Sequence, residues 1–278
     1  MLTSRAGVMV PGILYGTAWK KAETAALVGL AIAQGFRGID TACQPKHYDE
    51  GGVGAGLAPG PDAGPGRADL YLQSKFTSLS GQDPSRVPYD AQAPLPEQVA
   101  QSFAASLRNL RTEYLDCLVL HSPLETLAQT ELAWRSMEAL VDSGGVRQIG
   151  LSNCYSLAEL EAIDRFARIK PAVLQNRFHA ATGYDREIRA FCLEHEIIYQ
   201  SFWTLTANPR VLSARAITDL ASELERTPAQ ILFRHLTQGG VVPLTGTRSA
   251  AHMREDLSIF DFELSPAERG RIDALLTA

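Results

Sequence analysis

Apolar residues follow two alternating patterns along this chain. Short continuous apolar runs, typical of buried strands, alternate with longer segments in which apolar residues recur every three or four positions, as on one face of a helix. The short runs predict eight strands, at residues 13–18, 37–40, 70–76, 115–122, 148–153, 172–176, 197–202 and 240–245. The periodic segments predict intervening helices, at residues 24–34, 96–110, 127–142, 157–167, 187–194 and 228–238.

Polar residues mark the starts of several helices. In a capping box, a Ser or Thr and a Glu or Gln three residues later bond each other's backbone N–H, and proline is favoured in the first turn. Such signals occur in three places: Ser156 with Glu159, Ser265 with Glu268, and Thr227 with Pro228.

Strands that alternate with helices indicate a parallel sheet with helical crossovers. Eight repeats in 278 residues match a closed (β/α)8 TIM barrel better than an open doubly wound sheet. We therefore expect an α/β fold with a single barrel domain over residues 1–278. No Gly-x-Gly-x-x-Gly follows the first predicted strand, and the glycine cluster at 51–56 begins a helical segment, which disfavours a Rossmann domain.

Composition narrows the class of protein. A net charge of −5, with scattered Lys and Arg, gives no reason to expect a nucleic-acid or membrane partner. No run approaches the roughly 18 apolar residues of a membrane span, and no signal-peptide core is present, so we expect a cytoplasmic protein. The 4 cysteines have no Cys-x-x-Cys spacing and are expected to be reduced thiols. We expect a monomer or a weak homo-oligomer.

Two stretches contain turn-forming residues without periodicity. The Pro- and Gly-rich residues 58–66 predict a surface loop before the third strand. Residues 77–94, after that strand, form a long insertion of the kind that is more often functional than structural. We expect this insertion to line the mouth of the barrel and to influence specificity.

Four polar residues lie at or just after the carboxyl ends of successive predicted strands. Asp40 ends the second strand, Lys75 and His121 lie near the ends of the third and fourth, and Tyr48 lies in the loop after the second. These strand ends form one mouth in a barrel, and catalytic groups gather there. We therefore expect the four side chains to converge.

These residue types suit the reduction of an aldehyde or ketone. Negative charge develops on the carbonyl oxygen as hydride arrives, so an acid must deliver a proton. Tyr48 suits this role, because tyrosine has a pKa of roughly 10, and a Lys75 cation beside it would lower that pKa. Asp40 would keep Lys75 charged, and His121 would hydrogen-bond the substrate oxygen. Tyr71 is a distant alternative for the acid.

Other interpretations stay open. Asp residues after strands usually form turns or caps, Lys is usually solvated, and an interior His is often hydrogen-bonded within the protein. The barrel could bind a nucleotide without turnover, since fold does not fix function. It could be a metal-dependent hydrolase using Asp40, His47 and His121, although these residues lack convincing ligand spacing. The same site could instead reduce an enone or imine, or assist a redox-neutral biosynthetic step.

Several segments resemble the aldo-keto reductase family, in the same order and over nearly the whole chain. They are Gly16-Thr17-Ala18-Trp19 and residues 35–42, 48–54, 114–121 and 146–153. The resemblance implies an NADPH-dependent oxidoreductase that acts on a small-molecule carbonyl substrate. It implies a catalytic set with Tyr48 as general acid, consisting of Asp40, Tyr48, Lys75 and His121, and a substrate site that includes Trp19, Tyr48 and His121.

The resemblance also implies a nicotinamide cofactor site, in which Ser152, Asn153 and Gln175 hold the carboxamide and Ser201 lies near the pyrophosphate. The whole implied set is Gly16, Thr17, Ser152, Asn153, Gln175, Gln200, Ser201, Thr247, Arg248, Glu255 and Asp256.

The chain departs from the family pattern in four places. In the first, residues 43–47 lengthen the link before Tyr48. In the second, Gln200 occupies the position of an aromatic residue that stacks on the nicotinamide in the family, so Phe202 or Trp203 would have to provide that ring.

The third departure is that the family's Pro-Lys-Ser pattern at the adenosine 2′-phosphate is absent. Thr247 and Arg248 are expected to bind that phosphate instead, with NADPH preferred to NADH, and Glu255 with Asp256 would lie near the adenine. His252 stands where a second arginine is common. The fourth departure is that the family's long C-terminal loop is essentially absent, so we expect a relatively open pocket.

Overall fold

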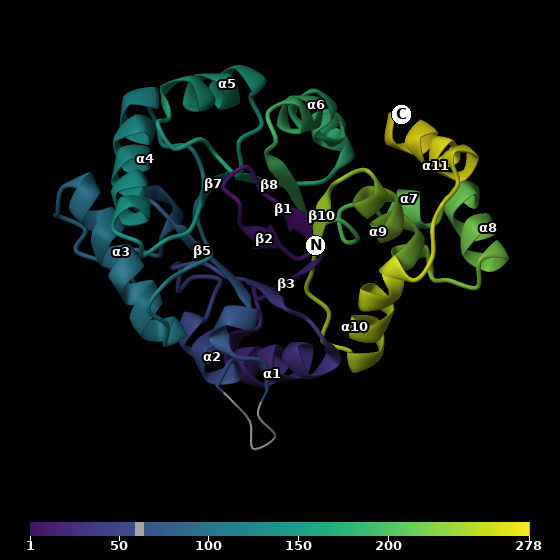
Figure 1. Ribbon diagram of the computed structural model, residues 1–278, viewed down its shortest axis with the longest axis horizontal. Coiled ribbons are helices and arrows are strands. Elements are labelled where there is room, and N and C mark those ends of the chain that lie inside the picture. Colours follow the sequence, from purple (N-terminus) through teal and green to yellow (C-terminus); the bar gives the residue numbers. More distant parts are fainter. Residues whose placement is uncertain (59–63, 278) are drawn as a thin grey trace.

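Eight parallel strands close into a barrel in the computed structural model, which describes residues 1–58 and 64–277. Figure 1 shows this barrel with helices around it. The strands are β3 (Leu14–Gly16), β4 (Gly38–Asp40), β5 (Tyr71–Phe76), β6 (Cys117–Leu120), β7 (Ile149–Ser152), β8 (Val173–Arg177), β9 (Ile198–Phe202) and β10 (Val242–Thr245). The predicted TIM barrel is confirmed. Seven strands lie inside the predicted runs, and β8 extends one residue further, to Arg177.

Helices follow the strands around the barrel, and the six predicted from periodicity are present with ends that differ by at most one residue. The helices are α1 (Thr24–Gln34), α2 (Glu50–Gly56), α3 (Leu95–Leu110), α4 (Leu127–Asp142), α5 (Leu157–Phe166), α6 (Arg186–Glu194), α7 (Pro209–Leu212), α8 (Arg215–Glu223), α9 (Pro228–Gln238), α10 (Ala250–Leu257) and α11 (Pro266–Asp273). Short 3-10 helices span Lys21–Glu23, Arg67–Asp69, Leu79–Gly81, Ala180–Asp185, Ser258–Phe260 and Ala274–Thr277. Among the described helices, none is long and apolar enough to cross a membrane.

Helix caps agree with the sequence signals in most respects. The Ser265 and Glu268 side chains bond each other's backbone N–H, as predicted. Thr227 also caps α9 through a reciprocal pair, with Gln230. Ser156 accepts from the backbone N–H of Glu159, but the return bond of a capping box is not formed there. The predicted surface loop at 58–66 falls mostly on residues 59–63, which lie outside the described residues.

The N-terminal end of the barrel is covered by a two-stranded antiparallel hairpin, β1 (Leu2–Thr3) and β2 (Met9–Val10). Figure 1 shows it across the centre of the barrel. Its Val10 packs inside the barrel among buried strand residues that include Leu14, Val119 and Val242. Ser4, between the two strands, donates a 2.5 Å hydrogen bond to Gln148. The hairpin therefore closes one end and leaves the carboxyl ends of the strands as the open mouth.

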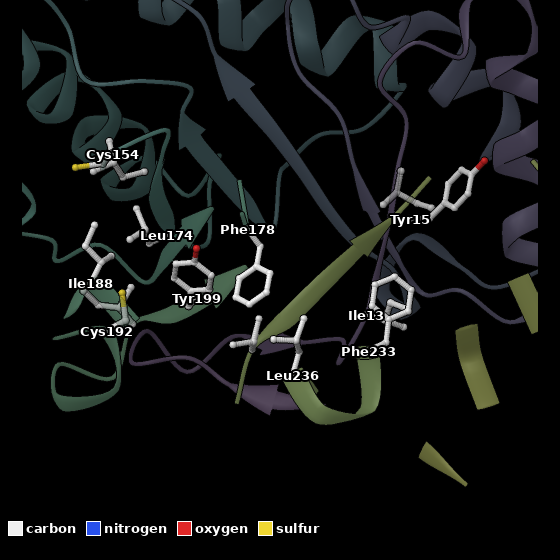
Figure 2. Packing of buried hydrophobic residues seen from close by; sticks show 14 of the residues in the cluster. Ile13, Tyr15, Cys154, Leu174, Phe178, Ile188, Cys192, Tyr199, Phe233 and Leu236 are labelled. Atoms are coloured by element: carbon white, nitrogen blue, oxygen red, sulfur yellow. The ribbon is translucent and has the colours of Figure 1, made fainter. Parts of the chain in front are cut away.

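A second and larger apolar core lies between the strands and the helices. Figure 2 shows part of this layer, with Phe178 near Tyr199 and Phe233 near Ile13. Trp134 of α4 is fully buried there, and its indole N–H donates to the backbone oxygen of Ile169. Apolar strand side chains in this layer face outward to the helices. The barrel interior holds the apolar cluster around Val10 and, separately, buried polar side chains that include Gln73, Lys75 and Gln200.

Helices α2 and α3 approach closely at Gly54. A Cβ atom placed on Gly54 would lie 2.2 Å from the backbone oxygen of Asn109 and 2.9 Å from Cα of Leu110. Both are backbone atoms, which cannot move aside as a flexible side chain can. Since α2 begins at Glu50, two residues after Tyr48, this contact fixes the helix that follows a candidate catalytic residue.

We expect Gly54→Ala to destabilise the fold by about 1–3 kcal/mol because it overpacks the α2–α3 contact. Gly51→Ala on the same helix is the matched control, since its Cβ would meet nothing closer than 3.5 Å and its higher helix propensity favours folding. Denaturant unfolding of both variants measures the difference. Equal stability of the two variants would contradict the close-contact explanation.

Candidate active site

The four candidate catalytic residues meet at the carboxyl ends of the strands. Asp40 is the last residue of β4, Lys75 lies near the end of β5, His121 follows β6, and Tyr48 lies just before α2. Asp40, Tyr48 and His121 line a cavity of about 1210 Å³ at the barrel mouth, and Lys75 is buried beneath it. The structure therefore brings these four residues together as expected.

Asp40 and Lys75 form a buried ion pair at the base of the cavity. The Lys75 ammonium lies 2.7 Å from each carboxylate oxygen of Asp40, and it donates a third hydrogen bond, of 2.8 Å, to the backbone oxygen of Thr41. The side chains of Lys75 and Asp40 are only 1% and 4% exposed. A buried pair needs such complete hydrogen bonding to offset the loss of hydration, so neither group is free to leave the other.

Three glutamines extend the polar environment of Asp40 into the barrel. Gln73 and Gln175 each donate from Nε2 to Asp40 Oδ1, at 2.8 and 2.9 Å. The same two nitrogens donate to Oε1 of Gln200, and Gln200 Nε2 donates back to Gln73 Oε1 at 3.1 Å. Because a carboxylate only accepts hydrogen bonds, Asp40 fixes which end of each amide faces it. Gln200 is thus fully buried in this network and does not line the cavity.

Tyr48 lies between the ion pair and His121. The Lys75 ammonium is 5.2 Å from the centre of the Tyr48 ring, and the His121 ring centre is 6.0 Å away. Burial, and then the nearby Asp40 charge, raise the pKa of Tyr48 well above its usual value. Burial is the larger of these two causes, and with a raised pKa Tyr48 is protonated at neutral pH.

His121 is held by Thr77, whose hydroxyl oxygen lies 2.6 Å from Nδ1. Burial, followed by the charges of Lys75 and His47, lowers the pKa of His121 to about 3. The imidazole is therefore neutral at neutral pH. A neutral ring has one N–H and one lone pair, so a Thr77 hydroxyl that donates to Nδ1 leaves Nε2 as the donor.

The lengthened link before Tyr48 folds into a turn. Backbone N–H groups of His47 and Tyr48 both donate to the oxygen of Gln44, at 3.0 Å, and the Gln44 amide donates to the backbone of Gly81. Tyr48 consequently faces the cavity despite the extra residues. The alternative acid, Tyr71, lies inside the barrel, where its hydroxyl donates to Gln73 and is absent from the cavity lining.

A family model described as "Aldo/keto reductase family" matches residues 6–277. The chain belongs to this family. Two relatives from Bacillus subtilis (strain 168) are each 31% identical to it. The "Uncharacterized oxidoreductase YtbE" matches over 89% of this chain and 82% of its own length, and the "Glyoxal reductase" over 91% and 83%. A solved aldo/keto reductase from Brucella melitensis has a TM-score of 0.83 at 26% identity, covering 99% of this chain and 98% of that chain.

This aldo/keto reductase is accordingly an oxidoreductase of a family that acts on carbonyl groups with nicotinamide cofactors, generally NADPH. The residues that the family resemblance implies for cofactor binding fall into two sets, according to whether they line the cavity. Those that line the cavity are Gly16, Ser152, Asn153, Gln175, Thr247, Glu255 and Asp256. Those outside the lining are Thr17, Gln200, Ser201 and Arg248.

The side chains of the second set bond to other groups of the protein. Thr17 donates to the backbone oxygen of Asp40, and Ser201 accepts from Thr204 at 2.9 Å. Arg248 forms an ion pair with Glu23 and donates to the backbone oxygen of Trp19 at 3.2 Å. Arg248 would therefore have to exchange its carboxylate partner to reach a phosphate in the cavity.

The mouth of the reductase includes residues that motif spacing did not single out. Arg177, Lys20, Leu205 and Thr206 line the cavity, together with Ala229 in the first turn of α9. Arg177 lies two positions after Gln175 on β8, and this period of two was the signal that would have placed it on the same face. Of the insertion at 77–94, only Thr77, Ser78, Ser80 and Gly81 line the cavity.

Phe202 and Trp203 both line the cavity. His47 stacks on Trp19 with ring centres 3.9 Å apart.

Within residues 1–58 and 64–277, no group of three or more His, Cys, Asp or Glu side chains is placed to hold a metal ion.

We expect the free energy of unfolding to fall as the pH is lowered from about 6.5 to about 3, in part because of His121. Its folded pKa lies below the ordinary value, so the unfolded chain binds the extra proton in this window and acid favours unfolding. Urea unfolding of wild type and His121→Gln across this range measures the effect. The variant should lose less stability on acidification, and identical pH slopes would contradict the assignment.

Proposed function

We propose that this chain reduces an aldehyde or ketone to the corresponding alcohol with NADPH, with Tyr48 as general acid. The observation that carries the proposal is a protonated tyrosine at the cavity between a neutral His121 and the Lys75 ammonium. This arrangement provides a proton donor and a polar site for the carbonyl oxygen at one point of the mouth.

The proposed step balances with one hydride and one proton. When bound, the cofactor supplies hydride to the carbonyl carbon, and its nicotinamide becomes oxidised. The Tyr48 hydroxyl gives its proton to the carbonyl oxygen as negative charge develops there. Burial opposes the tyrosinate that results, and the Lys75 cation 5.2 Å from the ring offsets this by attraction. Asp40 keeps Lys75 charged and in place.

The cavity has the size and the polar groups for a dinucleotide beside a small substrate. Its volume of about 1210 Å³ exceeds the roughly 300–1,000 Å³ of sites for drug-sized ligands. Both amide hydrogens of Gln175 are used by Asp40 and Gln200. Its Oε1 is therefore the available group, and we propose that it accepts a hydrogen bond from the nicotinamide carboxamide. Ser152 and Asn153 lie beside it at the end of β7.

Two observations support the choice of substrate and cofactor. The relative named glyoxal reductase is consistent with a small carbonyl substrate. Arg248 lies next to Thr247, which does line the cavity, so an Arg248 side chain released from Glu23 would be available to hold a 2′-phosphate. We therefore propose NADPH rather than NADH.

Tyr48→Phe should lower kcat/KM for carbonyl reduction by about 100-fold or more while NADPH still binds, since it removes only the proton donor. The measurement is NADPH oxidation at 340 nm across aldehydes, ketones, enones and imines, with cofactor binding followed by fluorescence. Tyr114→Phe is the matched control, because Tyr114 packs between Arg67 and Arg147 and is absent from the cavity lining.

Retained turnover in Tyr48→Phe, with Tyr114→Phe unchanged, would move the acid role to another group. Wild-type protein that binds NADPH but reduces none of the panel would instead favour a regulatory or redox-neutral role. Turnover of enones or imines alone would keep the site and change the reaction.

Arg248→Ala should raise the Kd for NADPH about tenfold and change the Kd for NADH by less than about twofold, because only NADPH has the 2′-phosphate. Fluorescence titration with both cofactors measures this. Arg254→Ala serves as control, since Arg254 bonds Gln34 on the outer face of α10 and does not line the cavity. Equal weakening of both cofactors would overturn the 2′-phosphate assignment.

A further inference from the structure

Arg177 is a cation in the cavity lining without an acidic partner among the described residues. It is the last residue of β8, two positions beyond Gln175, so its side chain lies on the same face of the strand, nearer the mouth. None of the ion pairs in the described chain includes it. Its Nε is buried and has no hydrogen-bond partner. The terminal N–H groups of the guanidinium are therefore the donors that remain for a ligand in the cavity.

Trp203 holds the Arg177 guanidinium in a defined orientation. The guanidinium carbon lies 4.2 Å from the centre of the Trp203 ring system, within the range of a cation–π contact. A stacked guanidinium keeps its N–H groups in a plane, and these can bind a carboxylate through two parallel hydrogen bonds. Trp203 also lines the cavity, so the stacked pair forms part of its wall.

A chain of hydrogen bonds connects Arg177 to the candidate catalytic residues. The backbone N–H of Arg177 donates to the Tyr155 hydroxyl at 3.0 Å, and that hydroxyl donates to Asn153 Oδ1 at 3.2 Å. The Asn153 amide in turn donates to the backbone oxygen of His121 at 2.8 Å. The end of β8 is thereby fixed relative to His121.

Acidic residues of the lining do not neutralise Arg177. Within the described lining they are Asp40, which is paired with Lys75, and Glu255 and Asp256. The last two belong to α10, which packs against α1 and α9. The wall near β8 therefore carries a positive charge and no carboxylate of its own.

We propose that Arg177 binds the anionic group of the carbonyl substrate, so that this reductase prefers aldehydes or ketones that carry a carboxylate. This inference rests on the proposed function. A phosphate of the cofactor offers the same anionic chemistry as a second source, and the experiment below separates the two.

The test compares 4-formylbenzoate with its uncharged methyl ester, which presents the same aldehyde. Wild type should have a higher kcat/KM for the acid than for the ester. Arg177→Gln should lower the acid-to-ester ratio of kcat/KM about tenfold to hundredfold, mostly through KM for the acid, because a charge-assisted bond is lost. Arg177→Lys should restore part of the ratio, since it keeps the charge without the planar fork.

Arg135→Gln is the matched control, because Arg135 is 55% exposed on α4 and pairs with Glu131 away from the cavity. Thermal melting of each variant checks that folding is intact. An unchanged acid-to-ester ratio in Arg177→Gln overturns the proposal. If that variant instead raises the Kd for NADPH with the ratio unchanged, the cation belongs to the cofactor site and the proposal is also overturned.

Failure of the proposed function is distinguishable from failure of this inference. If wild type reduces neither the acid nor the ester, carbonyl reduction itself is in question for these substrates. If wild type reduces the ester and Arg177→Gln leaves the preference unchanged, carbonyl reduction stands and only the assignment of Arg177 fails.

Discussion

The buried ion pair between Asp40 and Lys75 is the interaction on which the rest of the site depends. Two opposite charges are removed from water here, and the hydrogen bonds that they make to each other, to the backbone oxygen of Thr41 and to two glutamines offset this cost. Asp40 Oδ1 accepts from Lys75, Gln73 and Gln175, so one oxygen connects three strands of the barrel. Loss of either charge would leave the other unpaired in the interior, which is far more costly than loss of a surface ion pair.

Gln200 extends the hydrogen-bonded network of the Asp40–Lys75 ion pair into the barrel. In place of an aromatic ring that faces the cofactor, the chain has an amide that turns into the barrel and pairs with Gln73. That choice extends the hydrogen-bonded network around Asp40 and fixes Gln175 with its oxygen available. The aromatic surface is then left to Phe202 and Trp203, two and three residues further along the chain, which line the cavity. The base of the site is rigid and polar, while its rim carries the rings and the unpaired Arg177.

Electrostatic effects at the site follow burial more than charge. Burial raises the pKa of Tyr48 and lowers the pKa of His121. Before any ligand binds, Tyr48 is therefore a protonated phenol and His121 a neutral imidazole. Lys75 lies 5.2 Å from the Tyr48 ring centre, as the strand ends indicated, while burial raises the pKa of Tyr48. The positions of the strand ends predict that Tyr48 and Lys75 lie close together. How deeply Tyr48 is buried depends instead on the turn at residues 43–47 and on the walls of the cavity.

The sequence by itself determined the order of strands and helices and the convergence of Asp40, Tyr48, Lys75 and His121, because a two-residue or 3.6-residue period and a parallel barrel leave few alternatives for strand ends. Tertiary structure alone decided the rest. The N-terminal hairpin closes one end, Arg248 pairs with Glu23, and Arg177 stacks on Trp203 unpaired. Each of these contacts joins residues far apart in the chain, or sets a side-chain direction, and local periodicity carries no information about either.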